Sequence, residues 1–390
     1  MSWNKTIFEN LYSIESRNGL TKPSKIRGFG FKMINMGELF ANDRIFDIPM
    51  EMVPLNEKEK QSAKVEKDDL LFARQSLVLE GAGKCSIVMD VSPLTVFESH
   101  IIRVRLNKEK GIPLFYYYYF KSPFSPIKTI VSQCAQAGIR GSELQKLEVV
   151  YPPKETQQRI ADILSSYDDL IENNQKQIKL LEEAAQRLYK EWFVDLHFPG
   201  YENTPIIDGV PDGWNKVTLD TIAPIVTGKK DANFGTPDGK YLFFTCAQEP
   251  IKAPSYSFDC NAVILAGNGD FNVKLYRGQF EAYQRTYVFS PYESKHLYLL
   301  YHAVRESMRQ LFQGASGSTI KFLTRHMLED IAVFVPDKDV LNAFNNICDV
   351  IQQKIERLKA QIMYSQEARD RLLPKLMSGE IEVFNNEQRN

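Results

Sequence analysis

The sequence of 390 residues has no long apolar run and no sign of a targeting segment. Its longest apolar stretches, such as residues 114–120, are far shorter than the roughly 20 residues that a membrane-spanning helix needs. Residues 1–9 contain neither the basic region nor the apolar region of a secretory signal peptide. We therefore expect a cytoplasmic protein with no membrane partner.

Cysteine and histidine are also scarce. The five cysteines are widely separated and include no C-x-x-C pair, which excludes a disulfide framework and the usual zinc sites. No two of the five histidines stand at the spacing of metal ligands. We predict reduced, structural thiols and no metal site in this chain. The residues concerned are Cys85, Cys134, Cys246, Cys260, Cys348, His100, His197, His296, His302 and His326.

Motifs for catalysis on nucleic acids or nucleotides are missing. A DNA methyltransferase needs an N/D-P-P-Y/F tetrapeptide, and residues 151–154 lack both of its ends. Residues 81–85 resemble a phosphate-binding loop, but Val78 stands where that motif has its first glycine and Cys85 replaces the hydroxyl residue. A turn between two strands is the better interpretation. We predict that this chain binds no cofactor and catalyses no reaction.

An internal repeat is what the sequence does contain. A chain of this length favours two or more domains. Residues 3–5 recur as residues 214–216, an offset of 211, and residues 147–188 recur without gaps at an offset of 184. A looser similarity links residues 69–73 to residues 262–266. Alternating and β-branched runs inside each half, punctuated by glycine-rich turns, predict one related, strand-rich mixed domain per half.

Two long segments carry apolar residues spaced alternately four and three apart, which is typical of coiled-coil helices. No proline or glycine interrupts them before Pro374, so each predicts a helix of roughly 30–40 residues. An exposed apolar seam needs a partner, and we predict that the two helices pack antiparallel, with an approximate twofold relation between the halves. Asn174 either fixes the register or lies at an exposed edge. The predicted seam residues are Ile160, Leu164, Tyr167, Ile171, Ile178, Leu181, Leu188, Phe344, Ile351, Ile355, Leu358, Ile362 and Leu372.

Acidic pairs on the first long segment lie off this seam. We interpret Asp168-Asp169 and Glu182-Glu183 as solvated helix faces rather than as an acid–base pair. The aromatic run at residues 116–119 could stack on bases, although a half-buried strand or helix is the preferred interpretation.

Two related domains at a fixed separation suit a ligand with two half-sites, and duplex DNA is the commonest such ligand. Because the halves have diverged, we expect an asymmetric target with an unread gap. The net charge of −1 is low for a DNA-binding chain, so segregated charge or a partner must supply part of the grip. Candidate base and phosphate contacts are polar residues in loops. They are Lys22, Lys25, Arg27, Arg74, Gln75, Arg140, Lys229, Lys230, Asn268, Lys274, Arg277 and Arg285.

Three motifs resemble one known family. Residues 187–200, R-L-Y-K-E-W-F-V-D-L-H-F-P-G, resemble the central region of type I restriction-modification specificity subunits, with Leu196 where phenylalanine is common. Residues 149–161 resemble the family's entry to its first long helix, and residues 372–381 resemble its C-terminal ending. The resemblance covers essentially the whole chain, but residues 337–341 depart from the pattern, which leaves the partner contacts of the second half less defined.

The resemblance implies a non-catalytic, α+β subunit with two DNA target recognition domains. Two methyltransferase subunits holding S-adenosylmethionine would dock on the long helices, and restriction (translocase) subunits holding ATP and magnesium would join them. The expected parts are a first recognition domain (1–152), a central helix (153–198), a second recognition domain (199–336), a C-terminal helix (337–379) and a tail (380–390). Two alternatives remain, namely the C-terminal recognition portion of a fused restriction-methylation enzyme and a coiled-coil assembly scaffold.

Overall fold

The chain forms two compact units in the computed structural model, which describes residues 3–133, 137–269, 271–315 and 321–383. Unit 1 comprises Met1–Asn173 and Gln361–Asn390, and unit 2 comprises Asn174–Ala360. Helices and strands are mixed in both, so the predicted α+β class is confirmed. Cys134 and the part of the predicted tail from residue 384 onward lie outside the described residues.

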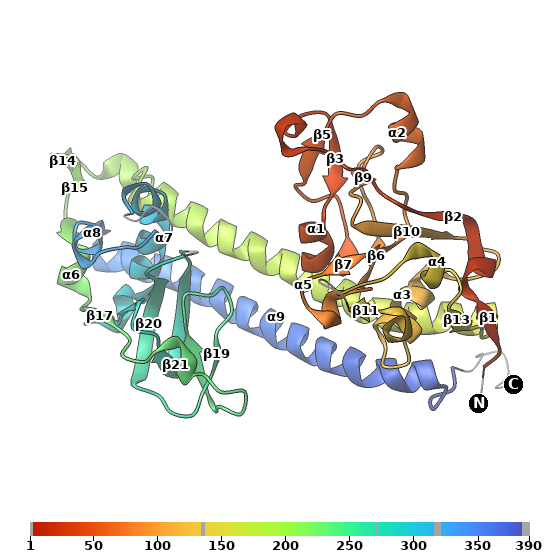
Figure 1. Cartoon of the computed structure of the whole chain (residues 1–390). Coiled ribbons are helices and arrows are strands. Elements are labelled where there is room, and N and C mark those ends of the chain that lie inside the picture. The colour runs from red at the N-terminus through yellow and green to blue at the C-terminus, as the bar shows by residue number, and fades with distance from the viewer. Residues whose placement is uncertain (1–2, 134–136, 270, 316–320, 384–390) are drawn as a thin grey trace, which may run out of the picture. The chain divides into compact units, whose positions relative to one another are not determined.

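Unit 1 is built around a five-stranded sheet with the order β2-β10-β6-β8-β4. Helix α3 (Pro113–Lys121) packs against it (Figure 1). Alternate residues of β6 face two different cores: Leu70 and Phe72 pack with α3, whereas Leu71 and Ala73 pack with β3 (Phe31–Ile34) and β9 (Val96–Phe97). Burial on both faces explains why this strand is a continuous apolar run. The strands are β2 (Tyr12–Asn18), β10 (Ile101–Leu106), β6 (Leu70–Ala73), β8 (Cys85–Val88) and β4 (Arg44–Ile45).

Smaller sheets and short helices complete unit 1. One three-stranded sheet has the order β5-β3-β9, another has the order β11-β12-β7, and β1 pairs with β13. These elements are β5 (Glu51–Val53), β3 (Phe31–Ile34), β9 (Val96–Phe97), β11 (Ser132–Gln133), β12 (Ala137–Gly138), β7 (Gln75–Ser76), β1 (Lys5–Ile7), β13 (Glu148–Val150), α1 (Met36–Ala41), α2 (Glu57–Ser62), α4 (Gly141–Leu144), and the 3-10 helices η1 (Phe8–Leu11), η2 (Ser24–Ile26), η3 (Leu79–Gly81) and η4 (Pro126–Ile130).

Unit 2 is built around a six-stranded sheet with the order β17-β22-β20-β21-β18-β19, against which α7 packs. Two further pairs are β14 with β15 and β16 with β23. The elements are β17 (Ile225–Thr227), β22 (Thr286–Phe289), β20 (Phe258–Ala266), β21 (Val273–Ala282), β18 (Tyr241–Phe244), β19 (Ile251–Ala253), β14 (Ile206–Ile207), β15 (Val210–Pro211), β16 (Asn215–Thr218), β23 (Ala332–Val335), α6 (Leu219–Ile222), α7 (Leu297–Gly314), α8 (Arg325–Glu329), η5 (Tyr201–Asn203), η6 (Ala232–Phe234) and η7 (Ser294–His296).

The same hydrogen bonds recur in both units at the offsets found in the sequence. The backbone N–H of Phe8 donates to the carbonyl of Leu147 at 2.8 Å, and that of Leu219 donates to Ile331 at 2.9 Å. The two donors are related by the offset of 211, and the two acceptors by the offset of 184. The first residues of α3 and α7 are also related by the offset of 184.

Side chains on these two helices repeat as well. The Tyr117 hydroxyl accepts a hydrogen bond from Lys121 at 3.2 Å, and the Tyr301 hydroxyl accepts one from Arg305 at 3.1 Å. The offset of 184 relates both donors and both acceptors. The gapless repeat therefore extends into the helix that covers the sheet of each unit. The aromatic run at residues 116–119 lies in α3, as the preferred interpretation of a half-buried strand or helix allowed, but its side chains are buried rather than half-buried.

Two long helices contribute to both units. They are α5 (Lys154–Phe193) and α9 (Lys338–Ser378). Every predicted seam residue is buried or half-buried, in keeping with the heptad spacing. The predicted central helix ran to residue 198, but α5 ends at Phe193, and Leu196 adopts a left-handed backbone with φ of 61°. Residues of that conformation terminate helices.

The exposed-edge alternative for Asn174 is wrong, because that residue is only 2% exposed. The interpretation of Asp168 as solvated is also wrong, because it is 6% exposed. In unit 1, Arg159 of α5 donates to the carbonyl of Val383, and Arg369 of α9 binds Asp168 at 2.5 Å. Within this unit the two chain segments therefore run in opposite directions, and α9 covers the helix face that carries Asp168.

Candidate nucleic-acid interface

Three of the predicted contact residues in unit 1 lie together although they are distant in sequence. The N–H of Arg74, directly after β6, donates to the carbonyl of His100 at 2.8 Å. The carbonyl of Arg74 accepts from Ile139 at 2.9 Å, which places the next residue, Arg140, beside this loop. Gln75 pairs with β12 in the small sheet. The structure thus assembles Arg74, Gln75 and Arg140 into one loop site.

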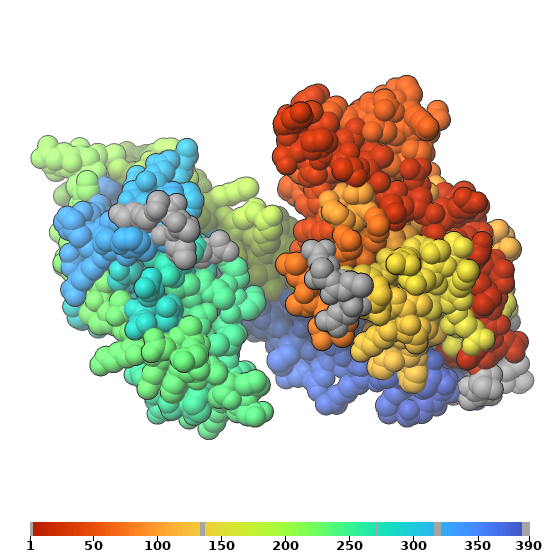
Figure 2. Space-filling model, viewed as in Figure 1, coloured from red at the N-terminus to blue at the C-terminus, as the bar shows by residue number. Residues whose placement is uncertain are grey.

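An apolar segment borders this loop site. Leu77, Val78 and Leu79 are 89%, 60% and 47% exposed, and Arg140 is exposed as well. Figure 2 shows the orange surface of this segment on the same face of unit 1 as the golden surface around α4. Sequence reasoning missed the segment, since a Leu-Val-Leu run is typical of a buried strand. Consecutive apolar residues with this degree of exposure are unusual on a protein surface.

Another predicted group in unit 1 lies in the loop between β2 and β3. Lys22 forms an ion pair with Glu59 at 2.9 Å, and Arg27 forms one with Glu51 at 2.6 Å. Lys25 is exposed, and no other described residue pairs with its side chain. A phosphate contact from Lys22 or Arg27 would therefore have to displace a carboxylate, whereas Lys25 needs no such exchange.

Unit 2 assembles an equivalent loop site. Gln284 donates its N–H to the carbonyl of Lys230 at 2.9 Å, and Gly267 donates to the carbonyl of Arg285 at 2.9 Å. These bonds bring together the predicted residues Lys229, Lys230, Asn268 and Arg285. Of these, Lys229 and Arg285 are exposed.

The two loop sites share a backbone hydrogen bond. Leu323 donates to the carbonyl of Gly267 at 2.8 Å, and this bond repeats the one between Ile139 and Arg74. Gln75 and Asn268 stand two residues after β6 and β20, at matching positions of the repeat. Both side chains are amides, the type that reads adenine by paired hydrogen bonds.

The remaining candidates of unit 2 are held by internal contacts. Lys274 donates to the carbonyl of Ala247 at 2.9 Å and also to the Asn272 side chain, and burial lowers the pKa of Lys274. Arg277 donates to the hydroxyl of Tyr298 at 2.7 Å and lies 3.4 Å from the carboxylate of Asp349 on α9. Arg277 thus links β21 to a long helix. The structure does not bring these two residues into hydrogen-bonding contact with the loop site.

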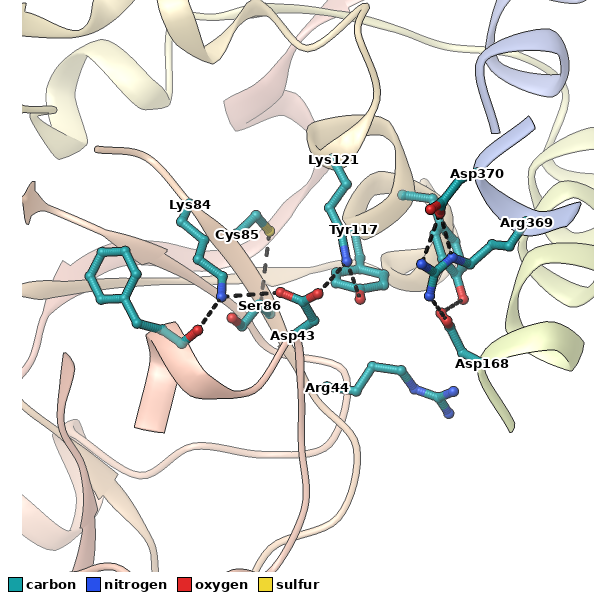
Figure 3. A network of polar contacts seen from close by, with 12 residues as sticks. Asp43, Arg44, Lys84, Cys85, Ser86, Tyr117, Lys121, Asp168, Arg369 and Asp370 are labelled. Carbon is teal, nitrogen blue, oxygen red and sulfur yellow. Dashed lines mark hydrogen bonds and ion pairs between the residues drawn. The ribbon is translucent and has the colours of Figure 1, made fainter. Parts of the chain in front are cut away.

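A buried polar network joins the sheet of unit 1 to both long helices. The Tyr118 hydroxyl donates to Asp168 at 2.6 Å, and Arg44 donates to Asp169 at 2.6 Å. Arg369 lies between Asp168 and Asp370 (Figure 3). Burial lowers the pKa of Arg369, but the two carboxylates outweigh that effect and raise it. Burial, together with the charge of Asp168, raises the pKa of Tyr118.

In unit 2, a hydrogen-bonded pair of neutral side chains, His302 and Gln186, joins α7 to the long helix α5. His302 is 3% exposed, and its Nδ1 donates to Oε1 of Gln186 at 2.9 Å. The Gln186 amide nitrogen donates to Glu306 at 2.7 Å. Burial lowers the pKa of His302 to about 3, with Arg305 as a smaller cause, so the imidazole is neutral at physiological pH.

Acidification should therefore destabilise unit 2 through His302. The unfolded imidazole takes up a proton below about pH 6.5, whereas the folded one stays neutral until about pH 3. Its contribution to stability is complete above pH 6.5 and falls by about 1.4 kcal/mol for each pH unit below that value. Urea unfolding at pH 7.5 and pH 5 should show this loss, and His302→Asn should reduce it. His326→Asn, at a side chain that is 82% exposed, provides the comparison for the same substitution at the surface.

Neither a metal-binding cluster nor a membrane-spanning helix occurs in the part of the chain that the structure describes. Among the described residues, no group of three or more His, Cys, Asp or Glu side chains is arranged to hold a metal ion, and no helix is both long and apolar enough to cross a bilayer. Residues 81–84 lie between β7 and β8, with a turn at Ala82 and Gly83, and Cys85 begins β8, so the interpretation as a turn between two strands is confirmed. Lys84 there binds Asp43 at 3.1 Å and the carbonyl of Phe40 at 2.7 Å.

Comparison with known proteins points to one family. Residues 10–183 match the type I restriction modification DNA specificity domain. The EcoDI specificity subunit of Escherichia coli is 35% identical over 176 residues, which cover 44% of this chain and 39% of that protein. The MjaIX specificity subunit of Methanocaldococcus jannaschii is 27% identical over 331 residues, covering 75% of this chain and 74% of that protein. The putative MjaX specificity subunit is 24% identical over 94% of this chain and 91% of its own length.

The fold has a counterpart among solved structures. The S subunit of a type I restriction-modification system from M. genitalium aligns with a TM-score of 0.58 at 15% identity. The alignment covers 99% of this chain and 97% of that protein. At this level of identity, the similarity concerns the fold alone.

Proposed function

We propose that this chain, which belongs to the family of type I restriction-modification specificity subunits, selects an asymmetric DNA target with two half-sites. Members of this family are DNA-recognition subunits that carry no catalytic centre and no cofactor of their own. The recognition domain of unit 1 would read one half-site and that of unit 2 the other. The EcoDI alignment spans about two fifths of that subunit.

The observation that carries the proposal is the pair of matching loop sites. Each site follows a central strand of its sheet, and each is closed by the same backbone hydrogen bond, from Ile139 to Arg74 and from Leu323 to Gly267. The backbone is repeated, but the side chains that it presents differ. Equivalent positions with different donors and acceptors read different bases, so the two half-sites should not be identical.

The long helices support a fixed spacing between the half-sites. We propose that α5 and α9 form an antiparallel coiled coil and that the two halves are related by a pseudo-twofold axis. In unit 1 this is supported by the opposite chain directions around the Asp168–Arg369 pair. In unit 2 it is supported by Phe344, near the start of α9, whose ring lies 6.0 Å from Trp192 near the end of α5.

The partners follow from the family. Two methyltransferase subunits with S-adenosylmethionine would dock on the long helices and modify the selected target. Restriction subunits, using ATP and magnesium, would complete the assembly. The chain has a net charge of −1, and its Lys22 and Arg27 form internal ion pairs. The partner subunits would therefore supply much of the electrostatic affinity for the DNA phosphates.

Single loop arginines should each affect one half-site. Arg140→Ala should lower methylation about tenfold and relax base choice in one half-site, and Arg285→Ala should do so in the other. Methylome sequencing of cells that express the chain with its methyltransferase subunits would report both half-sites and the gap. Lys5→Ala removes an exposed cation that pairs with Glu148 outside the loops, and it should leave the target unchanged.

Two outcomes would contradict this proposal. Methylation at a single uninterrupted sequence would show that the target does not consist of two half-sites. Methylation sites that stay the same after exchange of a whole recognition domain would favour an assembly scaffold instead.

A further inference from the structure

One position of the internal repeat links each recognition domain to the long helices. Tyr118 on α3 and His302 on α7 are related by the offset of 184, so they occupy the same position of the repeat. Tyr118 is 1% exposed and His302 is 3% exposed. Each makes its polar side-chain contact with α5 inside its own unit.

In unit 1 the contact is charged. The Tyr118 hydroxyl donates to Asp168 at 2.6 Å, and the other oxygen of that carboxylate accepts from Arg369 at 2.5 Å. Figure 3 shows how Arg369 reaches this carboxylate from α9. One side chain of the recognition domain is thereby tied to both long helices.

In unit 2 the contact is neutral. His302 donates to the side chain of Gln186, and the Gln186 amide nitrogen lies 3.3 Å from the backbone carbonyl of His302. The imidazole also stacks on Tyr189, with ring centroids 5.9 Å apart. The helix residue is thus held by both the side chain and the backbone of one residue of the recognition domain.

The neighbouring position of the repeat behaves differently. Tyr117 and Tyr301 are also equivalent, yet their hydroxyls accept hydrogen bonds from Lys121 and Arg305 of their own helices. Buried polar contacts add little net stability over apolar packing, but they are directional and favour one arrangement of the parts that they join. A contact between a recognition domain and α5 therefore constrains orientation, while a contact within one helix does not.

We infer that Tyr118 and His302 are positioning residues that set the orientation of each recognition domain on the long helices, and thereby the gap that the protein accepts between half-sites. This inference rests on the proposed two-part target. Each added base pair moves the second half-site by about 3.4 Å along the duplex and about 34° around it. A firmly held domain cannot follow that movement without strain, whereas a loosened domain can.

The test compares matched variants in the assembled methyltransferase. Tyr118→Phe removes one hydroxyl, and His302→Leu removes the contact with Gln186. Methylation would be measured on DNA with the correct gap and with gaps one base pair shorter or longer. We expect the preference for the correct gap to fall about tenfold in each variant, with the bases of both half-sites unchanged. Tyr117→Phe and Tyr301→Phe, at the neighbouring position of the repeat, should keep the full preference.

The outcomes separate this inference from the proposed function and from mere stabilisation. If the unmodified complex methylates no two-part target, the proposed function fails. If it does, and the variants lose thermal stability but keep their gap preference, the positioning role is wrong. Should His302→Leu fail to fold, His302→Asn, which retains a donor toward Gln186, should restore the gap preference. In that case the gap preference of Tyr118→Phe still tests the positioning role in unit 1.

Discussion

Replacing Arg369 with alanine should lower the free energy of unfolding of unit 1 by about 3–5 kcal/mol. The carboxylate of Asp168 is 6% exposed, and Arg369 provides its opposite charge at 2.5 Å. Without the guanidinium, the carboxylate stays buried, and among the described residues the Tyr118 hydroxyl is the one side-chain donor that it keeps. An uncompensated buried charge is among the most destabilising single changes. Urea unfolding, followed by circular dichroism, would measure the loss.

Arg371 provides the matched control, because it lies two residues away on the same helix. Its side chain is 78% exposed and pairs with Glu367 one turn earlier. Such surface pairs contribute roughly 0–1 kcal/mol, so Arg371→Ala should have little effect. Adding Asp168→Asn to Arg369→Ala should recover part of the loss, because it removes the buried charge. Equal effects of Arg369→Ala and Arg371→Ala would show that the buried pair has no special role.

Replacing Phe344 with alanine should destabilise unit 2 by about 3–5 kcal/mol. This residue is fully buried near the start of α9. Its ring centroid lies 4.9 Å from that of Phe193, 6.0 Å from Trp192 and 5.9 Å from His302. Alanine would leave a cavity where the end of α5, the start of α9 and the helix of the recognition domain meet. The midpoint of urea unfolding would measure the change.

Val350 supplies the comparison for Phe344, six residues further along α9. It is 69% exposed, so Val350→Ala should change stability by no more than about 0.5 kcal/mol. The substitution Phe344→Ala should also weaken the protection of the backbone amides of α7 from hydrogen exchange, because His302 loses one of its ring neighbours. A Phe344→Ala protein with unchanged stability would mean that this junction is not the centre of the core of unit 2.

The repeat and the helices could be read from the sequence because they depend on regular spacing. The offset of 184 also relates the helices that begin at Pro113 and Leu297, although only the segment from residue 147 onward had been recognised as gapless. The burial or half-burial of the apolar residues along the two long helices could be predicted for the same reason, since an apolar side chain every three or four residues must be covered.

Features that depend on contacts between distant segments could not be read in this way. Asp168 was assigned to a solvated face because its own helix leaves it off the seam, and its burial arises from Tyr118 and Arg369. The exposed Leu77 and Val78 were missed because apolar runs predict buried strands. The assignment of DNA contacts stays a prediction, because the sequence of a loop does not encode which of its side chains reach a base.

Unit 1 combines the beginning of the sequence with the segment Gln361–Asn390, and this affects how the protein is made. Its core includes Leu376 and Met377 next to Ile160 and Leu164, whereas unit 2 is the continuous segment Asn174–Ala360. Because a ribosome releases the chain in order, unit 2 can finish folding first. Until Leu376 and Met377 are synthesised, the apolar face at Ile160 and Leu164 stays exposed on the nascent chain. A stop codon that removes residues 361–390 should therefore damage the first recognition domain more than the second.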